Sequence, residues 1–174
     1  MHDIDVGPVE ASDIASIGSL YREVVRHGTA SFEIDPPDDR EMARRAEALV
    51  SGGFSYLVAR RNGRMLGYAY AGPYRPRPAY RFTVEDSIYV EPDAHGRGIG
   101  RLLLGRLVED STARGFRQMI AVIGDSANRA SIALHRSHGF RDAGLFESIG
   151  WKHGRWLDTV LMQRELGAGA GAPA

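Results

Sequence analysis

The chain has 174 residues, of which 43% are hydrophobic and 25% charged, and this composition suits one globular domain large enough to bury a core. Lys plus Arg and Asp plus Glu number 22 each, so there is no electrostatic reason to expect nucleic acid or an anionic membrane as a partner. The absence of cysteine excludes disulfides, thiolate metal sites and a cysteine acyl-enzyme, and no apolar run approaches the ~20 residues of a membrane span.

The N-terminal part of the sequence predicts a strand and two helices. It lacks the basic and apolar segments of a signal peptide, so we expect a cytoplasmic protein. A short strand from Ile4 to Val9 precedes a helix that Ser12 caps, and apolar residues follow at helical spacing as far as Val25. Residues 28–37 read as a loop, and a second helix runs roughly from Asp39 to Val50.

The middle of the chain predicts a hairpin followed by a long strand. The strands Phe54 to Arg60 and Met65 to Ala71 are joined by Asn62-Gly63, a sequence strongly preferred in two-residue hairpin turns. A proline-rich loop follows at residues 72–79, and Arg81 to Val90 is rich in β-branched and aromatic residues. That composition predicts a strand.

The C-terminal part alternates helices with strands. An apolar helix from Ile99 ends at Gly115, and a strand is expected from Phe116 to Ile123. A helix from about Asn128 to His138 follows, with Asp125 or Ser126 as its cap. The last strands are expected at residues 142–149 and 155–164, as an antiparallel pair turned at 151–154. We find no repeat and no linker, so the order of elements predicts one mixed α/β domain over residues 1–166, and the small-residue tail 167–174 is expected to be disordered.

A glycine-rich turn between the strand ending at Val90 and the helix beginning at Ile99 is the most informative stretch. Its glycines are Gly96, Gly98 and Gly100. A helix start carries unpaired N–H groups and partial positive charge, so this turn is suited to bind phosphate. No lysine follows the glycines as in a P-loop, and the spacing and mid-chain position do not fit the dinucleotide fingerprint.

Several motifs in the right order resemble the GNAT superfamily of N-acetyltransferases. The turn resembles its Q/R-x-x-G-x-G/A loop, with His95 in place of Gln or Arg, and residues 124–140 resemble its second block, in which Asn opens a helix and a His or aromatic follows seven residues on. FTVEDSIYV at 82–90, GWKHGRWLD at 150–158 and the segment AGPYRPRPAYRFTVE resemble the phosphinothricin acetyltransferase branch, which includes enzymes acting on methionine sulfone and sulfoximine. The resemblance extends from about Ile4 to Arg164.

This resemblance implies a mixed, largely antiparallel sheet flanked by helices, with acetyl-CoA as co-substrate. The matching cofactor-binding positions are Ile88, Tyr89, Val90, His95, Gly96, Arg97, Gly98, Ile99, Gly100, Arg101, Asn128 and Ser131. We expect no metal, because the H-x-x-H pair of His135 and His138 has no evident third ligand.

The reaction requires a general base, because an ammonium group must lose a proton before it attacks a thioester. The resemblance assigns that role to Glu85, acting through a water. Glu85 lies in an apolar, aromatic strand, where burial raises a carboxyl pKa; the alternative is a carboxylate paired with an arginine. His135 lies two helical turns after Asn128 on one face, and the resemblance points it at the thioester, to bond the acyl group or protonate the thiolate. The alternative is a histidine that serves packing alone.

The acceptor site is expected on the proline-rich loop. Arg75 and Arg77 flank Pro76, and an arginine fork suits a carboxylate; a solvated basic loop is the alternative. The resemblance implies that these arginines, Tyr80 and Thr83 bind an amino-acid analogue. It also implies a homodimer in which the loop carrying Phe32 reaches the neighbouring site.

The function expected from the sequence is transfer of acetyl from acetyl-CoA to the α-amine of a small amino-acid analogue. Two alternatives remain. One is an acetyltransferase for another amine, such as a protein N-terminus, a polyamine or an aminoglycoside, although the arginines of the acceptor loop favour an anionic or zwitterionic acceptor. The other is an acyl-CoA-binding module without activity, which would be expected to lack Glu85 and His135.

Overall fold

The structure, a computed structural model, describes residues 4–172. Its strands and helices are β1 (Asp5–Pro8), α1 (Ile14–His27), α2 (Asp39–Ser51), β2 (Tyr56–Arg61), β3 (Arg64–Pro73), β4 (Thr83–Val90), α3 (Ile99–Ala113), β5 (Gln118–Gly124), α4 (Arg129–Ser137), β6 (Arg141–Lys152) and β7 (Arg155–Glu165). They form one seven-stranded sheet in the order β1-β2-β3-β4-β5-β7-β6. All neighbouring strands are antiparallel except β4 and β5, which confirms the expected mixed α/β fold.

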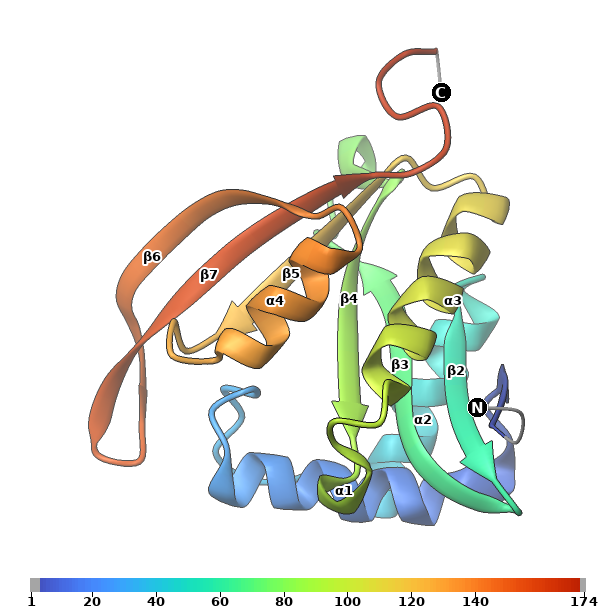
Figure 1. Ribbon diagram of the computed structural model, residues 1–174, viewed down its shortest axis with the longest axis vertical. Coiled ribbons are helices and arrows are strands. Elements are labelled where there is room, and N and C mark those ends of the chain that lie inside the picture. The colour runs from blue at the N-terminus through green and yellow to red at the C-terminus, as the bar shows by residue number, and fades with distance from the viewer. Residues whose placement is uncertain (1–3, 173–174) are drawn as a thin grey trace.

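Helices cover both faces of the sheet, so each face has its own core. In Figure 1, α3 and α4 lie in front of the sheet, α2 lies behind it and α1 crosses the lower end. Leu103, Leu104 and Leu107 of α3 are fully buried on the front face. On the other face, α1 and α2 bury Ile17 and Tyr68, within a group of stacked and edge-to-face tyrosines.

The predicted hairpin is confirmed in position and turn chemistry. β2 and β3 pair through Arg61 and Arg64, and the two residues between them, Asn62 and Gly63, have φ of 51° and 76°. Both values lie in the left-handed region that a type I′ turn requires. The predicted helices and remaining strands also form, with bounds shifted by a few residues.

Two predicted helix caps are wrong. Ser12 does not cap the first helix, because a short 3-10 turn over Ala11–Asp13 comes first. There the side chain of Asp13 accepts a hydrogen bond from the Glu10 N–H at 2.8 Å, and the Arg60 guanidinium binds the same carboxylate. A charged carboxylate with a guanidinium partner makes stronger hydrogen bonds than a hydroxyl.

The cap of α4 is Asn128, rather than Asp125 or Ser126. Its side-chain oxygen accepts from the Ser131 N–H at 3.2 Å. Asp125 and Ser126 are engaged elsewhere, since Arg155 binds Asp125 at 2.5 Å and Ser126 donates to a carboxylate of β7 at 2.6 Å.

The sheet contains a fork between its two parallel strands. β4 and β5 pair from Thr83 to Asp86 and from Gln118 to Ala121. Beyond that point β4 stays with β3 while β5 stays with β7, and Figure 1 shows the two strands diverging toward α1. The facing edges of residues 87–90 and 122–124 are therefore open to a ligand.

The C-terminal hairpin of β6 and β7 projects beyond the rest of the sheet (Figure 1). Nearly all of β6 is exposed. Residues 167–172 continue as turns and bends, and the division into a domain ending at 166 and a disordered tail stays a prediction. Within residues 4–172, no helix is long and apolar enough to cross a membrane.

Candidate active site

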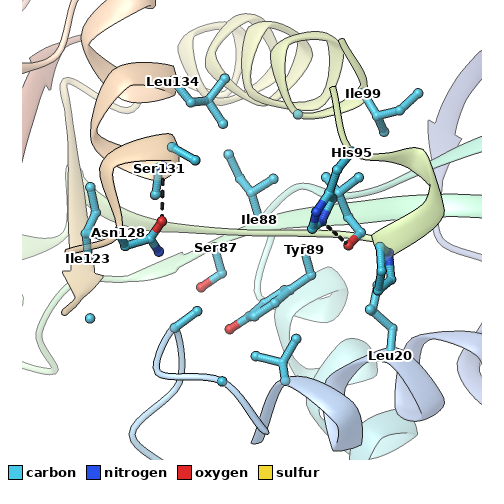
Figure 2. Close-up of a pocket in the computed structure, with 18 of the residues that line it drawn as sticks. Leu20, Ser87, Ile88, Tyr89, His95, Ile99, Ile123, Asn128, Ser131 and Leu134 are labelled. Carbon is cyan, nitrogen blue, oxygen red and sulfur yellow. Dashed lines mark hydrogen bonds between the residues drawn. The ribbon is translucent and has the colours of Figure 1, made fainter. Parts of the chain in front are cut away.

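A cavity of about 680 Å³ occupies the fork. Its walls are β4, β5, the C-terminal part of α1, one face of α4 and the glycine-rich turn before α3. Figure 2 shows Asn128, Ser131 and Leu134 on one side, His95 and Ile99 on the other, and Ile88 between them. The expected cofactor positions that line it are Ile88, Tyr89, Val90, His95, Gly96, Gly98, Ile99, Gly100, Asn128 and Ser131. Arg97 and Arg101 do not line the cavity and are exposed beside it.

The glycine-rich turn has the backbone geometry that its sequence predicts. Gly96 and Gly98 have φ of 71° and 81°, and a Cβ at either position would meet no atom within 4 Å. The requirement for glycine is therefore conformational, and the space beside the turn is open. Gly98 is the N-cap of α3, and its carbonyl accepts from Leu102. The first N–H groups of α3 therefore remain available to an anion.

His95 occupies the position where Gln or Arg was expected. Its Nε2 lies 3.0 Å from the Val90 carbonyl oxygen. Because a carbonyl only accepts, Nε2 donates in this contact and Nδ1 is left for a ligand. Figure 2 shows this hydrogen bond beside the cavity.

Glu85 does not line the cavity. Successive strand residues face opposite sides of the sheet, and Glu85 lies on the α1 and α2 face whereas Asp86 faces α4. Glu85 is half-buried. Burial raises its pKa above the ordinary value, the Arg75 guanidinium acts in the opposite sense, and Asp86 adds to the rise. The direction of the shift agrees with the sequence expectation for a general base, and the role itself stays a prediction.

His135 is buried at the fork, with both ring nitrogens bound to protein. Nε2 lies 2.9 Å from an Asp86 carboxylate oxygen and Nδ1 lies 2.7 Å from the Ser131 carbonyl oxygen. The rings of His135 and Phe140 pack edge-to-face, with their centroids 5.0 Å apart. The expected role of His135 at the thioester stays a prediction, and the structure adds Asp86 as the carboxylate that contacts its ring.

Asp86 is the functional candidate that the sequence analysis missed. It lines the cavity and is only 7% exposed. A signal was available, since strand alternation places this acid on the same face as the apolar Val84 and Ile88. A carboxylate on a core face needs a partner, and His135 is the residue that supplies it.

The expected acceptor residues gather at the start of β4, outside the cavity. Arg75 and Arg77 are exposed on the loop before the short turn Pro78–Tyr80. The Arg75 guanidinium lies 4.4 Å from the Tyr74 ring centre, and Tyr74 packs edge-to-face on Tyr80 at 5.7 Å. Thr83 begins β4. No carboxylate in the described residues forms a salt bridge with either arginine, so both remain available to a ligand.

Phe32 lies against its own chain. Its ring fills a slot between Gly124 and Gly150, where a Cβ at either glycine would collide with it. Lys152 donates to the Ser31 carbonyl at 2.6 Å and ties the same loop to β6. The reach of this loop into a neighbouring subunit, which the resemblance implied, stays a prediction.

Within residues 4–172, no group of three or more His, Asp or Glu residues is arranged to hold a metal ion. The cavity has the glycine-rich turn and the first N–H groups of α3 at one end, and the buried Asp86–His135 pair lines it at the fork. The positions of these groups match what transfer from a phosphate-bearing thioester requires.

Comparisons with known proteins agree with this geometry. Residues 19–140 match the acetyltransferase (GNAT) family. The chain is 54% identical to a phosphinothricin N-acetyltransferase of Alcaligenes faecalis over 161 residues, which cover 92% of this chain and 82% of that one. It is 39% identical to an L-methionine sulfoximine/L-methionine sulfone acetyltransferase of Pseudomonas paraeruginosa, over 93% and 94% of the two chains.

A solved structure shares the whole architecture. It is a GNAT superfamily phosphinothricin acetyltransferase from Sinorhizobium meliloti in complex with AcCoA, and the two chains align with a TM-score of 0.95 and 50% identity, over 98% and 92% of their lengths. The seven-stranded sheet, its fork and the glycine-rich turn, together with these matches, identify the chain as a member of the acetyltransferase (GNAT) family.

Proposed function

We propose that this enzyme transfers the acetyl group of acetyl-CoA to the α-amine of a small amino-acid analogue of the phosphinothricin, methionine sulfone or methionine sulfoximine type. The observation that carries the proposal is the fork itself. Its cavity joins a phosphate-binding turn to the strand that bears Glu85. The named activities of the relatives support the same acceptor class.

In the proposed mechanism Glu85 removes a proton from the acceptor ammonium through a water. The neutral amine attacks the thioester carbon and a C–N bond forms; the nitrogen then gives its second proton to solvent as the C–S bond breaks to release coenzyme A thiolate. The pKa of Glu85, raised mainly by burial, brings its proton affinity toward that of the amine, which is the condition for efficient general base catalysis.

Acceptor recognition falls to Arg75, Arg77, Tyr80 and Thr83. The prolines at 73, 76 and 78 restrict the loop, so less conformational entropy is lost when a ligand orders it. A carboxylate bound by the arginines leaves the α-amine free to extend toward Glu85. Phe32, held beside Gly124, is the residue with which each subunit would complete the acceptor site of its neighbour.

We also propose that the enzyme works as a homodimer. The hairpin of β6 and β7 exposes five large hydrophobic side chains, those of Leu145, Phe146, Ile149, Trp151 and Trp156. Such a concentration on one projecting hairpin is typical of a protein–protein interface. The cytoplasmic location expected from the sequence stays a prediction.

The test is an acceptor screen that measures release of the coenzyme A thiol. Methionine sulfone, methionine sulfoximine and phosphinothricin should be acetylated, and the matching decarboxylated amines should react poorly. Equal rates for amino acids and their decarboxylated forms would remove the carboxylate clamp and leave an acetyltransferase for another amine. Binding of acetyl-CoA without transfer to any amine would leave a binding module.

Arg77→Ala provides the matched test of the clamp. A hydrogen bond to a charged group contributes about 1.5–3 kcal/mol, so kcat/KM for methionine sulfone should fall by roughly ten- to a hundredfold. The variant should lose little against an amine without a carboxylate. A similar loss with both acceptors would mean that Arg77 acts on the fold of the loop.

A further inference from the structure

The proposed reaction leaves one proton without a donor. Glu85 accepts the proton of the amine, but the departing thiolate needs a proton from another group. The titratable side chains that line the cavity are Asp86 and His135 at the fork, Tyr89 on β4, His95 at the glycine-rich turn, and Glu23 and His27 of α1. Asp86 and His135 are the buried ones, with exposures of 7% and 4%.

The hydrogen bonds of His135 determine where its protons are. Nδ1 faces the Ser131 carbonyl oxygen at 2.7 Å; a carbonyl only accepts, so Nδ1 carries a hydrogen. Nε2 faces an Asp86 carboxylate oxygen at 2.9 Å, and a carboxylate also only accepts. Both acceptor oxygens therefore receive a hydrogen bond when His135 is an imidazolium that donates from both nitrogens. One mobile proton is then held between His135 and Asp86.

Electrostatics favour the same protonation state. Burial alone would lower the pKa of His135, but the hydrogen bond and charge of Asp86, together with the Ser131 carbonyl, outweigh burial and raise it above the ordinary value. An imidazole without such partners loses half of its charge below neutral pH. Asp86 therefore holds the pKa of His135 above its ordinary value.

We propose that Asp86 is a positioning residue that keeps His135 protonated at the reacting end of the cavity, so that the pair supplies the proton taken by the departing coenzyme A thiolate. The inference rests on the proposed acetyl transfer. An S–H bond forms as the Nε2–H bond breaks, which leaves a neutral imidazole with its hydrogen on Nδ1 beside the Asp86 carboxylate. A proton from solvent restores the pair after coenzyme A leaves.

The place of the pair in the fold supports this assignment. Asp86 is the last β4 residue paired with β5, opposite Ala121, so it stands where the strands part and the cavity begins. A thioester whose phosphates lie at the glycine-rich turn extends along β4 toward this point. The second carboxylate oxygen of Asp86 is buried and has no hydrogen-bond partner among the described residues. It can accept from a thiol S–H but repels a thiolate, and this favours protonation of the leaving group.

Other charges around the pair are directed elsewhere. Glu85 is adjacent in sequence but faces the opposite side of β4. On α4, Arg136 is exposed and binds Asp142 of β6 at 3.0 Å. The α1 residues of the cavity wall, Glu23 and His27, pair with each other at 3.6 Å. The aromatic contact of His135 is with Phe140, so Asp86 is the charged group in direct contact with the imidazole.

The main experiment is the pH profile of kcat for Asp86→Asn with acetyl-CoA and methionine sulfone. The basic limb, set by loss of the His135 proton, should move to lower pH, and turnover at pH 8.5 should fall on the order of tenfold or more. The acidic limb, set by Glu85, should stay in place. A basic limb that does not move would overturn the proposal.

A double-variant cycle separates action through His135 from a structural effect. His135→Gln should remove the basic limb, and addition of Asp86→Asn to that variant should cause no further loss, because the two residues act as one unit. A loss from Asp86→Asn that is as large without His135 as with it would assign Asp86 to folding and reject the proposed role.

A measurement on the wild-type enzyme keeps the proposal testable if Asp86→Asn does not fold. The imidazole NMR signals of His135, assigned by their absence in His135→Gln, are followed against pH in the coenzyme A complex. A ring still charged above pH 7 agrees with the proposal, and a neutral ring at pH 7 rejects it. If the wild type acetylated no acceptor, the proposed function would fail, whereas this titration would still report the state of the pair.

Discussion

Two consecutive acids on β4 have opposite surroundings. Glu85 lies half-buried on one face with Arg75 as its nearby cation, and Asp86 lies buried on the other face, bound to His135. Different environments on one strand allow one carboxyl to accept a proton while the other holds a proton on its partner. In the proposed mechanism, strand alternation therefore assigns proton removal and proton supply to opposite faces of β4.

Glu85→Gln should separate the base from a binding residue. Glutamine keeps the shape but cannot accept the proton, so kcat at pH 7 should fall by roughly 10²–10⁴-fold. The loss should shrink at high pH, where the acceptor amine is already neutral. The measurement is steady-state kinetics from pH 6 to 10, and the control is the affinity for coenzyme A, which should not change. Near-normal turnover at neutral pH would exclude Glu85 as the essential base.

The same variant should not be less stable than the wild type. A carboxyl whose folded-state pKa is raised opposes folding once pH exceeds its unfolded value, and it contributes nothing unfavourable when it is protonated in both states. Glu85→Gln should therefore raise Tm at pH 8 relative to wild type, and the difference should disappear near pH 3. Thermal unfolding at the two pH values measures this, and a lower Tm at pH 8 would contradict it.

At the scale of elements, the turn before α3 needs glycine for its positive φ angle, and no protein atom fills the space beside it. Gly98 has φ of 81° and an added Cβ would meet no protein atom within 4 Å. Gly63 in the hairpin turn has φ of 76° and the same open surroundings. The two glycines therefore carry similar conformational demands, but Gly98 alone lines the cavity.

Gly98→Val and Gly63→Val form a matched pair. Each should lower Tm, because a side chain in the left-handed region costs about 1–2 kcal/mol. Gly98→Val should also weaken coenzyme A binding, since its side chain enters the space beside the phosphate-binding backbone. Titration calorimetry on the folded variants measures their affinity for coenzyme A. Equal affinity in both variants would contradict the proposal that the turn before α3 binds the phosphates.

For the whole molecule, the projecting hairpin is the feature that a single subunit leaves unexplained. Trp151 and Trp156 pair across it with ring centroids 5.2 Å apart, yet they are 56% and 60% exposed. Phe146 and Ile149 on β6 are also about half exposed. This apolar surface extends from the strand that holds the Phe32 loop in place.

Phe146→Glu with Ile149→Glu should convert a dimer into monomers, because burial of two carboxylates in an apolar interface is strongly unfavourable. The control is Val50→Glu, which changes an apolar side chain of 52% exposure on α2. Light scattering after gel filtration should give a dimeric mass for wild type and control. A monomeric wild type would contradict the proposed assembly.

The sequence predicted the elements well because their signals are local. The turn at Asn62-Gly63, the glycines before α3 and the apolar stripe of that helix each depend on neighbours within a few residues. Helix caps were less predictable, because they depend on residues far away in the sequence. The carboxylate of Asp13, for example, is bound by Arg60 of β2. The Asp86–His135 pair was missed for the same reason, because its two members meet only when α4 packs beside β4.

The fork between β4 and β5 also makes the stability of this protein depend on the concentration of its co-substrate. The open strand edges are completed by a ligand, so the empty and loaded forms differ in stability by mass action. A co-substrate at a hundred times its Kd stabilises a protein by about 2.7 kcal/mol. A cell rich in acetyl-CoA would thus keep the chain folded and protected from proteolysis, whereas one short of it would degrade the chain sooner.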